Sequence, residues 1–142
     1  MLTKTAYMVA TAHLDTVWRW TIADTVEKFI PDTLSKNFDL IEKYPNDMFN
    51  FEGAYRYELI EEYYPMAFDQ IRRYVKTNRW NPAGSEYENG DVNIPSPEAI
   101  TRNILLGNNY FYEKFKKKSK DIFLPDCFGF GAQLPQIIND AG

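Results

Sequence analysis

A histidine and an aspartate near the N-terminus have the types and spacing of metal ligands. His13, the single histidine of the chain, stands two residues before Asp15 and directly after an apolar run. Residues i and i+2 of an extended segment point the same way, so the imidazole and the carboxylate can be aimed at one point. Both groups are common ligands of divalent metal ions. A hydrogen-bonded histidine beside a helix N-cap fits the same short pattern, so the spacing alone leaves both interpretations open.

The elements that must position these groups are predicted as alternating strands and helices. The apolar run 6–12 is typical of a buried strand, and His13 lies where it ends. Three further strands are predicted at 48–52, 79–84 and 121–125. Helices are predicted at 22–44, 55–78 (divided at Pro65), 97–120 and 132–140. This order predicts an α/β fold with a parallel sheet and right-handed crossovers.

Carboxylates follow the later predicted strands as well. Ligands in parallel α/β folds gather at the carboxyl ends of the strands. Four strand ends would therefore bring one histidine and several carboxylates to a single face. The carboxylates that follow the predicted strands are Asp15, Glu52, Glu86, Glu88, Asp91 and Asp126.

The composition of the chain narrows the range of functions and partners that it can have. With 142 residues the chain has the length of one domain, and its net charge of −4 argues against nucleic acid as the main partner. The single cysteine precludes an internal disulfide, and no apolar run has membrane-spanning length. The first residues lack the features of a secretory signal, which predicts a cytoplasmic protein, although a signal removed from the sequence would leave no trace. An aromatic content of 16% suits either a large core or the stacking of sugar rings.

Two segments carry a family resemblance. Ala12-His13-Leu14-Asp15-Thr16-Val17-Trp18-Arg19-Trp20 resembles the first motif of the α-mannosidases of glycoside hydrolase family 38, in which a tryptophan follows His-x-Asp. Pro125-Asp126-Cys127-Phe128-Gly129-Phe130-Gly131-Ala132-Gln133-Leu134-Pro135-Gln136-Ile137 is similar to the nucleophile motif of the same family. The intervening residues 79–107 are similar to the third strand and following helix of these enzymes. The likeness covers nearly the whole chain in the right order.

The resemblance implies a fold, a cofactor and a reaction. It implies that residues 1–142 are the N-terminal portion of a seven-stranded parallel α/β barrel, about four βα units, within a longer chain. His13, Asp15 and Asp126 would be ligands of Zn²⁺, and Asp126 would also be the catalytic nucleophile. Trp18 and Phe128 would form the mannose pocket. The reaction would be the retaining hydrolysis of terminal α-mannosides, with a mannose-containing glycan as substrate.

Two family features have no match here. The family has a second histidine ligand and a general acid beyond the nucleophile motif, and none of Glu52, Glu86, Glu88 and Asp91 matches the acid. Each of these four is expected to be either a solvated charge on a loop or a residue that contacts the metal ligands without binding the metal itself. We therefore expect the missing C-terminal part of the same chain to complete the site, and residues 1–142 alone to be inactive and to bind zinc weakly at most.

Three alternative functions remain at this point. A metal-dependent polysaccharide deacetylase would use aspartate and histidine ligands, but its His-x-x-x-His pair needs two histidines. A non-catalytic carbohydrate-binding module would use the aromatic residues alone, without metal or acid–base chemistry. A thiol enzyme would need Cys127 activated by His13, and Cys127 has no activating neighbour in the sequence.

Overall fold

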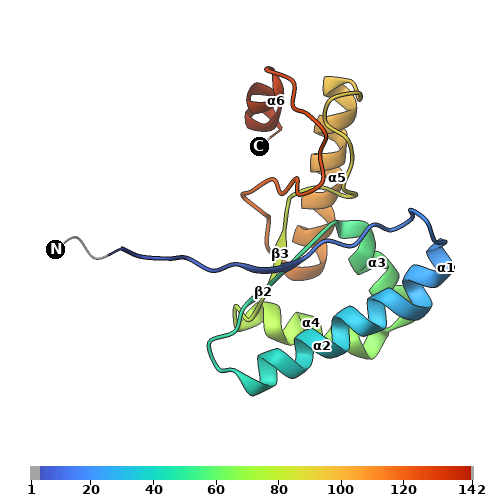
Figure 1. The fold of residues 1–142 in the computed structure, drawn as a ribbon, viewed down its shortest axis with the longest axis vertical. Helices are drawn as coiled ribbons and strands as arrows, with labels where there is room; N and C mark the ends of the chain where they lie inside the picture. The colour runs from blue at the N-terminus through green and yellow to red at the C-terminus, as the bar shows by residue number, and fades with distance from the viewer. Residues whose placement is uncertain (1–3, 142) are drawn as a thin grey trace.

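The chain folds as alternating strands and helices around a small parallel sheet (Figure 1). The structure is a computed structural model that describes residues 4–141. The strands are β1 (Ala10–Ala12), β2 (Phe49–Glu52) and β3 (Trp80–Ala83). The helices are α1 (Ile22–Asp24), the π-helix η1 (Thr25–Phe29), α2 (Ile30–Lys43), α3 (Ala54–Tyr63), α4 (Pro65–Lys76), α5 (Pro97–Phe115) and α6 (Leu134–Asp140).

The sheet places the end of β1 beside the end of β2. All pairings are parallel and the strand order is β1-β2-β3. Ala12 pairs with Phe51, so the next residues along each strand, His13 and Glu52, leave the sheet at the same level. This register explains how Glu52, at the end of β2, can contact the side chain of His13, which directly follows β1.

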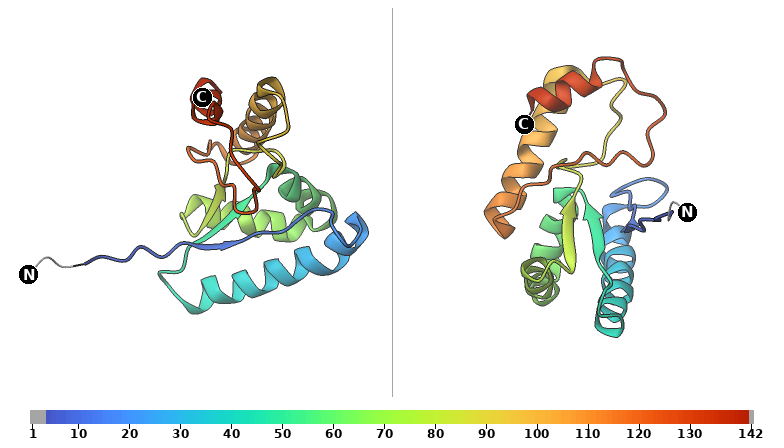
Figure 2. Two further views of the ribbon diagram at one scale, coloured as in Figure 1. Left: turned by 45° about the horizontal axis from the view of Figure 1, so that its top comes forward. Right: turned by 90° about the vertical axis from the view of Figure 1, so that its left-hand side faces the viewer.

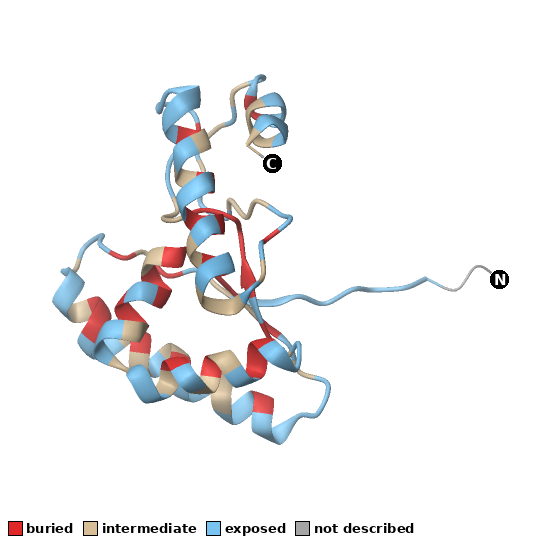
Figure 3. Ribbon diagram, turned by 180° about the vertical axis from the view of Figure 1, so that it is seen from behind, coloured by how far each residue is buried: buried red, intermediate tan, exposed pale blue. Residues whose placement is uncertain are grey.

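One face of the sheet forms the main core. Phe49, Phe51 and Trp80 are buried and in mutual aromatic contact, and helices α2, α3 and α4 contribute buried side chains to the same cluster. The alternate residues Asn50 and Asn81 point to the other face, where their side chains hydrogen-bond to each other. In Figure 3 the buried residues accordingly follow the strands and the inner sides of these helices.

A second, smaller cluster joins α5 to the C-terminal segment. Its buried members are Val92, Ile100, Ile104 and Leu134, and Figure 2 shows α5 and α6 side by side, away from α2. At Gly107 of α5 an added Cβ would lie 2.3 Å from the main chain of Ser85 and Glu86. The glycine therefore lets α5 approach the loop that follows β3.

The first predicted strand is shorter and more exposed than expected. Only Ala10–Ala12 pair with β2, whereas Tyr7 and Met8 are 90% and 96% exposed. The prediction of a buried strand over 6–12 is thus wrong: only its second half forms a strand, and Ala10 and Thr11 within that strand are exposed as well. The reason is that β1 is an edge strand, and no described element covers its outer side (Figure 1).

The predicted fourth strand is also absent from the described residues. Residues 121–125 pass the end of β3 without ladder hydrogen bonds. Asp121 instead accepts hydrogen bonds from the Gly84 amide and the Ser85 hydroxyl. The expectation of four βα units is corrected to three strands, and the seven-stranded barrel stays a prediction. The predicted helices form, including the division at Pro65, but α5 ends at Phe115 rather than at 120 because Lys116 adopts a left-handed conformation. No helix among the described residues is long and apolar enough to cross a membrane.

Candidate metal centre

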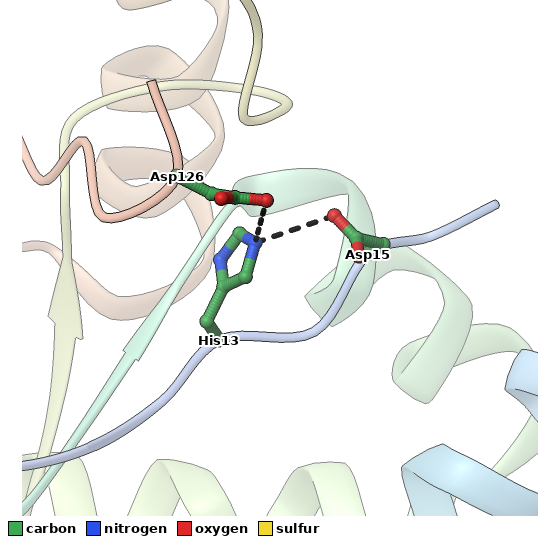
Figure 4. Close-up of side chains that lie close together, drawn as sticks. All are labelled: His13, Asp15 and Asp126. Carbon is green, nitrogen blue, oxygen red and sulfur yellow. Dashed lines mark ion pairs between the residues drawn. The ribbon is translucent and has the colours of Figure 1, made fainter. Parts of the chain in front are cut away.

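Three side chains from the two ends of the chain meet at one point beyond the sheet (Figure 4). His13 Nε2 lies 3.3 Å from Oδ1 of Asp15 and 4.0 Å from Oδ2 of Asp126. One potential ligand atom from each residue lies within 4.8 Å of the others. The family resemblance implied this set, and the fold brings its members together although 111 positions separate Asp15 and Asp126, counted from their numbers.

The donor set and spacing suit a small divalent ion. Nitrogen and oxygen ligands at roughly 2.0–2.2 Å from a tetrahedral zinc ion are about 3.3–3.6 Å apart. The distance between His13 and Asp15 falls in that range, and the distance between His13 and Asp126 exceeds it by a few tenths of an ångström. One imidazole with two carboxylates supplies three of the four ligands of a tetrahedral zinc site.

Glu52 fixes the orientation of the histidine ring. Its Oε1 lies 2.6 Å from Nδ1 of His13, and the Glu52 side chain is fully buried. Burial raises the pKa of this carboxyl, while the hydrogen bond from His13 and the guanidinium of Arg56 act in the opposite direction. A carboxylate on Nδ1 keeps the proton there, so the Nε2 lone pair is free to face Asp15 and Asp126.

The three side chains border a cavity of about 210 Å³. Phe128 lines this cavity and is 90% exposed, so its ring is open to a ligand. Trp18, expected in the same pocket, is not among the lining residues; it is exposed and packs edge-on against Trp20. The other residues that line the cavity are Asn89, Gly90, Asp91, Phe123, Leu124, Pro125 and Cys127.

The remaining carboxylates after the strands have different surroundings. Asp91 lines the cavity and accepts a hydrogen bond from the Asn93 amide. Glu88 lies 3.0 Å from the Arg56 guanidinium. Glu86 is buried, and burial, helped by the negative charge of Glu52, raises its pKa to about 8. Asp91 is exposed and fits the expected solvated loop charge, whereas Glu86 and Glu88 are held in contacts with other parts of the fold.

Sequence reasoning missed the part played by Arg56. This arginine of α3 is fully buried and donates from Nε to the Leu14 carbonyl, between His13 and Asp15. A single arginine in the first turn of a helix gives no sign of such a contact. The sequence offered one hint of unusual geometry near Arg56. Gly53 comes directly after a strand, where a glycine suggests a backbone conformation that other residues adopt with difficulty.

Comparisons with known proteins agree on one family. Residues 3–142 match the N-terminal domain of glycosyl hydrolases family 38. The chain is 35% identical to alpha-mannosidase G of Dictyostelium discoideum over 96% of its length, and 33% identical to human alpha-mannosidase 2C1 over 97%. It spans only 12% and 13% of these two proteins. The crystal structure of a family 38 protein from Enterococcus faecalis superposes on 95% of the chain, and on 15% of its own, with a TM-score of 0.77 at 22% identity.

Proposed function

This chain belongs to family 38 of the glycosyl hydrolases, and we propose that it supplies the N-terminal part of the catalytic domain of a zinc-dependent α-mannosidase. The substrate is a terminal α-mannoside of a mannose-containing glycan. Support comes from the relatives named alpha-mannosidase and from the meeting of His13, Asp15 and Asp126 at one cavity. That meeting is the observation on which the proposal chiefly rests.

His13, Asp15 and Asp126 would hold the zinc ion, with a fourth ligand from another part of the protein. When bound, the ion supplies a Lewis acid that orients sugar hydroxyl groups and stabilises negative charge. Glu52 keeps the His13 ring turned so that Nε2 faces the two carboxylates. Phe128 offers an apolar ring to the face of the sugar.

Asp126 is proposed as the nucleophile of a retaining mechanism. Its carboxylate attacks the anomeric carbon and the bond to the leaving oxygen breaks, which gives a covalent glycosyl–enzyme that water then hydrolyses. The half-exposed Asp126 side chain lines the cavity, where a sugar can reach it. Such a mechanism needs a second carboxyl group about 5–5.5 Å from the first to protonate the leaving oxygen. We assign that acid to the part of the protein beyond these residues, so residues 1–142 alone are proposed to be inactive.

The alternatives fit the site less well. A carbohydrate-binding module has no use for two carboxylates aimed at one imidazole nitrogen. A deacetylase of the His-x-x-x-His type lacks its second histidine. For a thiol enzyme, burial and the charges of Glu86 and Asp91 raise the pKa of the Cys127 thiol, which opposes formation of the thiolate.

Hydrolysis of p-nitrophenyl α-mannoside by the full-length protein tests the proposal. Activity should be lost on treatment with EDTA and restored by zinc, and Asp126→Asn should lower kcat by at least about 1,000-fold because the nucleophile is removed. Asp39→Asn, at an exposed position of α2, is the matched control and should retain activity. An Asp126→Asn variant with wild-type kcat would refute the nucleophile, and activity unaffected by EDTA would refute the zinc dependence.

A further inference from the structure

Arg56 is the most deeply buried charge in the described part of the chain that the proposed reaction does not use. Its side chain is inaccessible to solvent, and burial of an arginine is rare unless the charge is paired. Its Nε donates to the main-chain carbonyl of Leu14, and its Nη1 lies 3.0 Å from Oε1 of Glu88. The N–H at Nη1 is not aimed at the carboxylate, so this contact is an ion pair without a formal hydrogen bond.

Glu88 closes a ring around Asp15. Its second carboxylate oxygen accepts a hydrogen bond from the Thr16 hydroxyl. Arg56 thus holds the chain at Leu14, just before Asp15, and Glu88 holds it at Thr16, just after. Arg56 and Glu88 are in turn joined by their ion pair. We call these two residues the Arg56–Glu88 clamp.

The clamp is anchored to two helices. Arg56 belongs to α3, while Asn103 of α5 both donates to the Glu88 carbonyl and accepts from the Glu88 amide, at 2.8 and 3.0 Å. Gly53 leaves room for the guanidinium, because a Cβ there would lie 1.8 Å from Arg56 Nη1. The loop that carries His13 and Asp15 is therefore tied to the rigid part of the fold at both sides of Asp15.

We propose that Arg56 and Glu88 are positioning residues that hold the main chain of residues 13–16 so that the His13 and Asp15 side chains meet at one point. Neither residue touches the substrate or the metal in this role. The consequence for zinc rests on the proposed function above. The ordering of the loop itself does not, so the two can be tested apart.

Hydrogen exchange in the metal-free full-length protein tests the ordering. Arg56→Met removes both contacts and should speed exchange of the main-chain amides at 13–17 by about tenfold or more, while amides of α4 keep their wild-type rates. Glu88→Gln, which keeps the size of a half-buried side chain, should give a smaller effect in the same loop and serves if Arg56→Met fails to fold. Arg73→Met, at an exposed position of α4, is the matched control.

Zinc affinity, measured by competition with a chromophoric chelator, tests the consequence. Loss of a residue that orients metal ligands typically weakens affinity about 10–100-fold, and we expect this for Arg56→Met. Arg56→Lys should recover only part of the affinity, because a lysine cannot present the planar fork that reaches both Leu14 and Glu88.

The proposed role of the Arg56–Glu88 clamp would be refuted if Arg56→Met left the exchange rates of the amides at 13–17 unchanged, or raised exchange rates equally throughout the protein. A wild-type protein that binds no zinc would instead refute the proposed function and leave the exchange result to decide on the clamp.

Discussion

Nδ1 of His13 lies 2.6 Å from Oε1 of Glu52, a buried carboxylate at the end of the neighbouring strand. The parallel register of β1 and β2 brings these two residues to the same level, so the contact follows from the sheet itself. It leaves Nε2 of the same ring facing Asp15 and Asp126. A histidine, its carboxylate partner and two further carboxylates thus form one connected site.

The first prediction concerns Glu52. Glu52→Gln keeps the size of the side chain but replaces a charged acceptor by a neutral one, so the His13 ring is held less firmly and is a weaker donor to a metal. Zinc affinity of the full-length protein should fall about tenfold or more. Chelator competition measures this, with Glu27→Gln at an exposed position of η1 as the control. Equal affinities in all three proteins would show that Glu52 does not support the ligand.

A second prediction concerns Gly53. Its φ of +77° is unfavourable for other residues, and a Cβ would collide with the buried Arg56 guanidinium. Gly53→Ala should therefore destabilise the fold by about 1–3 kcal/mol, seen as a lower Tm. At Gly90 an added Cβ meets nothing within 4 Å, so Gly90→Ala is the matched control and should leave the Tm nearly unchanged. Equal Tm values for the two variants would contradict the packing described for Arg56.

A third prediction concerns pH. Burial raises the pKa of Glu86 from 4.5 to about 8 in the folded protein. Between these two pH values the unfolded chain releases a proton that the folded chain keeps, so the contribution of Glu86 to stability is full below pH 4.5 and is lost as the pH rises to about 8.

In the Glu86→Gln variant the side chain at this position cannot ionise, so the variant should not lose this contribution to stability as the pH rises. Relative to wild type, the variant should gain stability between pH 5 and pH 8, by a few kcal/mol at most on the order-of-magnitude relation of about 1.4 kcal/mol per pKa unit. Thermal melts of both proteins in EDTA measure the difference. A stability gap that stays constant across this range would mean that Glu86 ionises normally in the folded protein.

A fourth prediction concerns Phe128. The ring borders the cavity and is mostly exposed, so its removal should cost binding but not folding. An aromatic contact worth about 0.5–1.5 kcal/mol corresponds to a roughly 2- to 12-fold rise in KM for an α-mannoside, with an unchanged Tm. Phe130→Ala is the control, because Phe130 is exposed in the same motif but does not line the cavity. The same KM in both variants would remove Phe128 from the binding site.

The sequence allowed much of the fold and the central site to be predicted, for identifiable reasons. The helices and the strand at β2 have clear apolar periodicity, while the pattern at β3 is weaker. Asp126 was expected near His13 because both follow strand-like segments and both lie in motifs that resemble family 38. The length and burial of the first strand, and the existence of a fourth strand, were wrongly predicted, since apolar residues alone do not tell whether a neighbouring strand is present. The contact between Arg56 and Leu14 could not be predicted from local sequence patterns, because it joins residues 42 positions apart.

The most direct test of the account is the position of zinc in crystals of the full-length protein, found by anomalous scattering at the zinc absorption edge. We predict one strong peak in the cavity, at roughly 2.0–2.2 Å from Nε2 of His13 and from a carboxylate oxygen each of Asp15 and Asp126. A cavity without zinc at saturating concentration, or zinc bound elsewhere by other residues, would contradict the account.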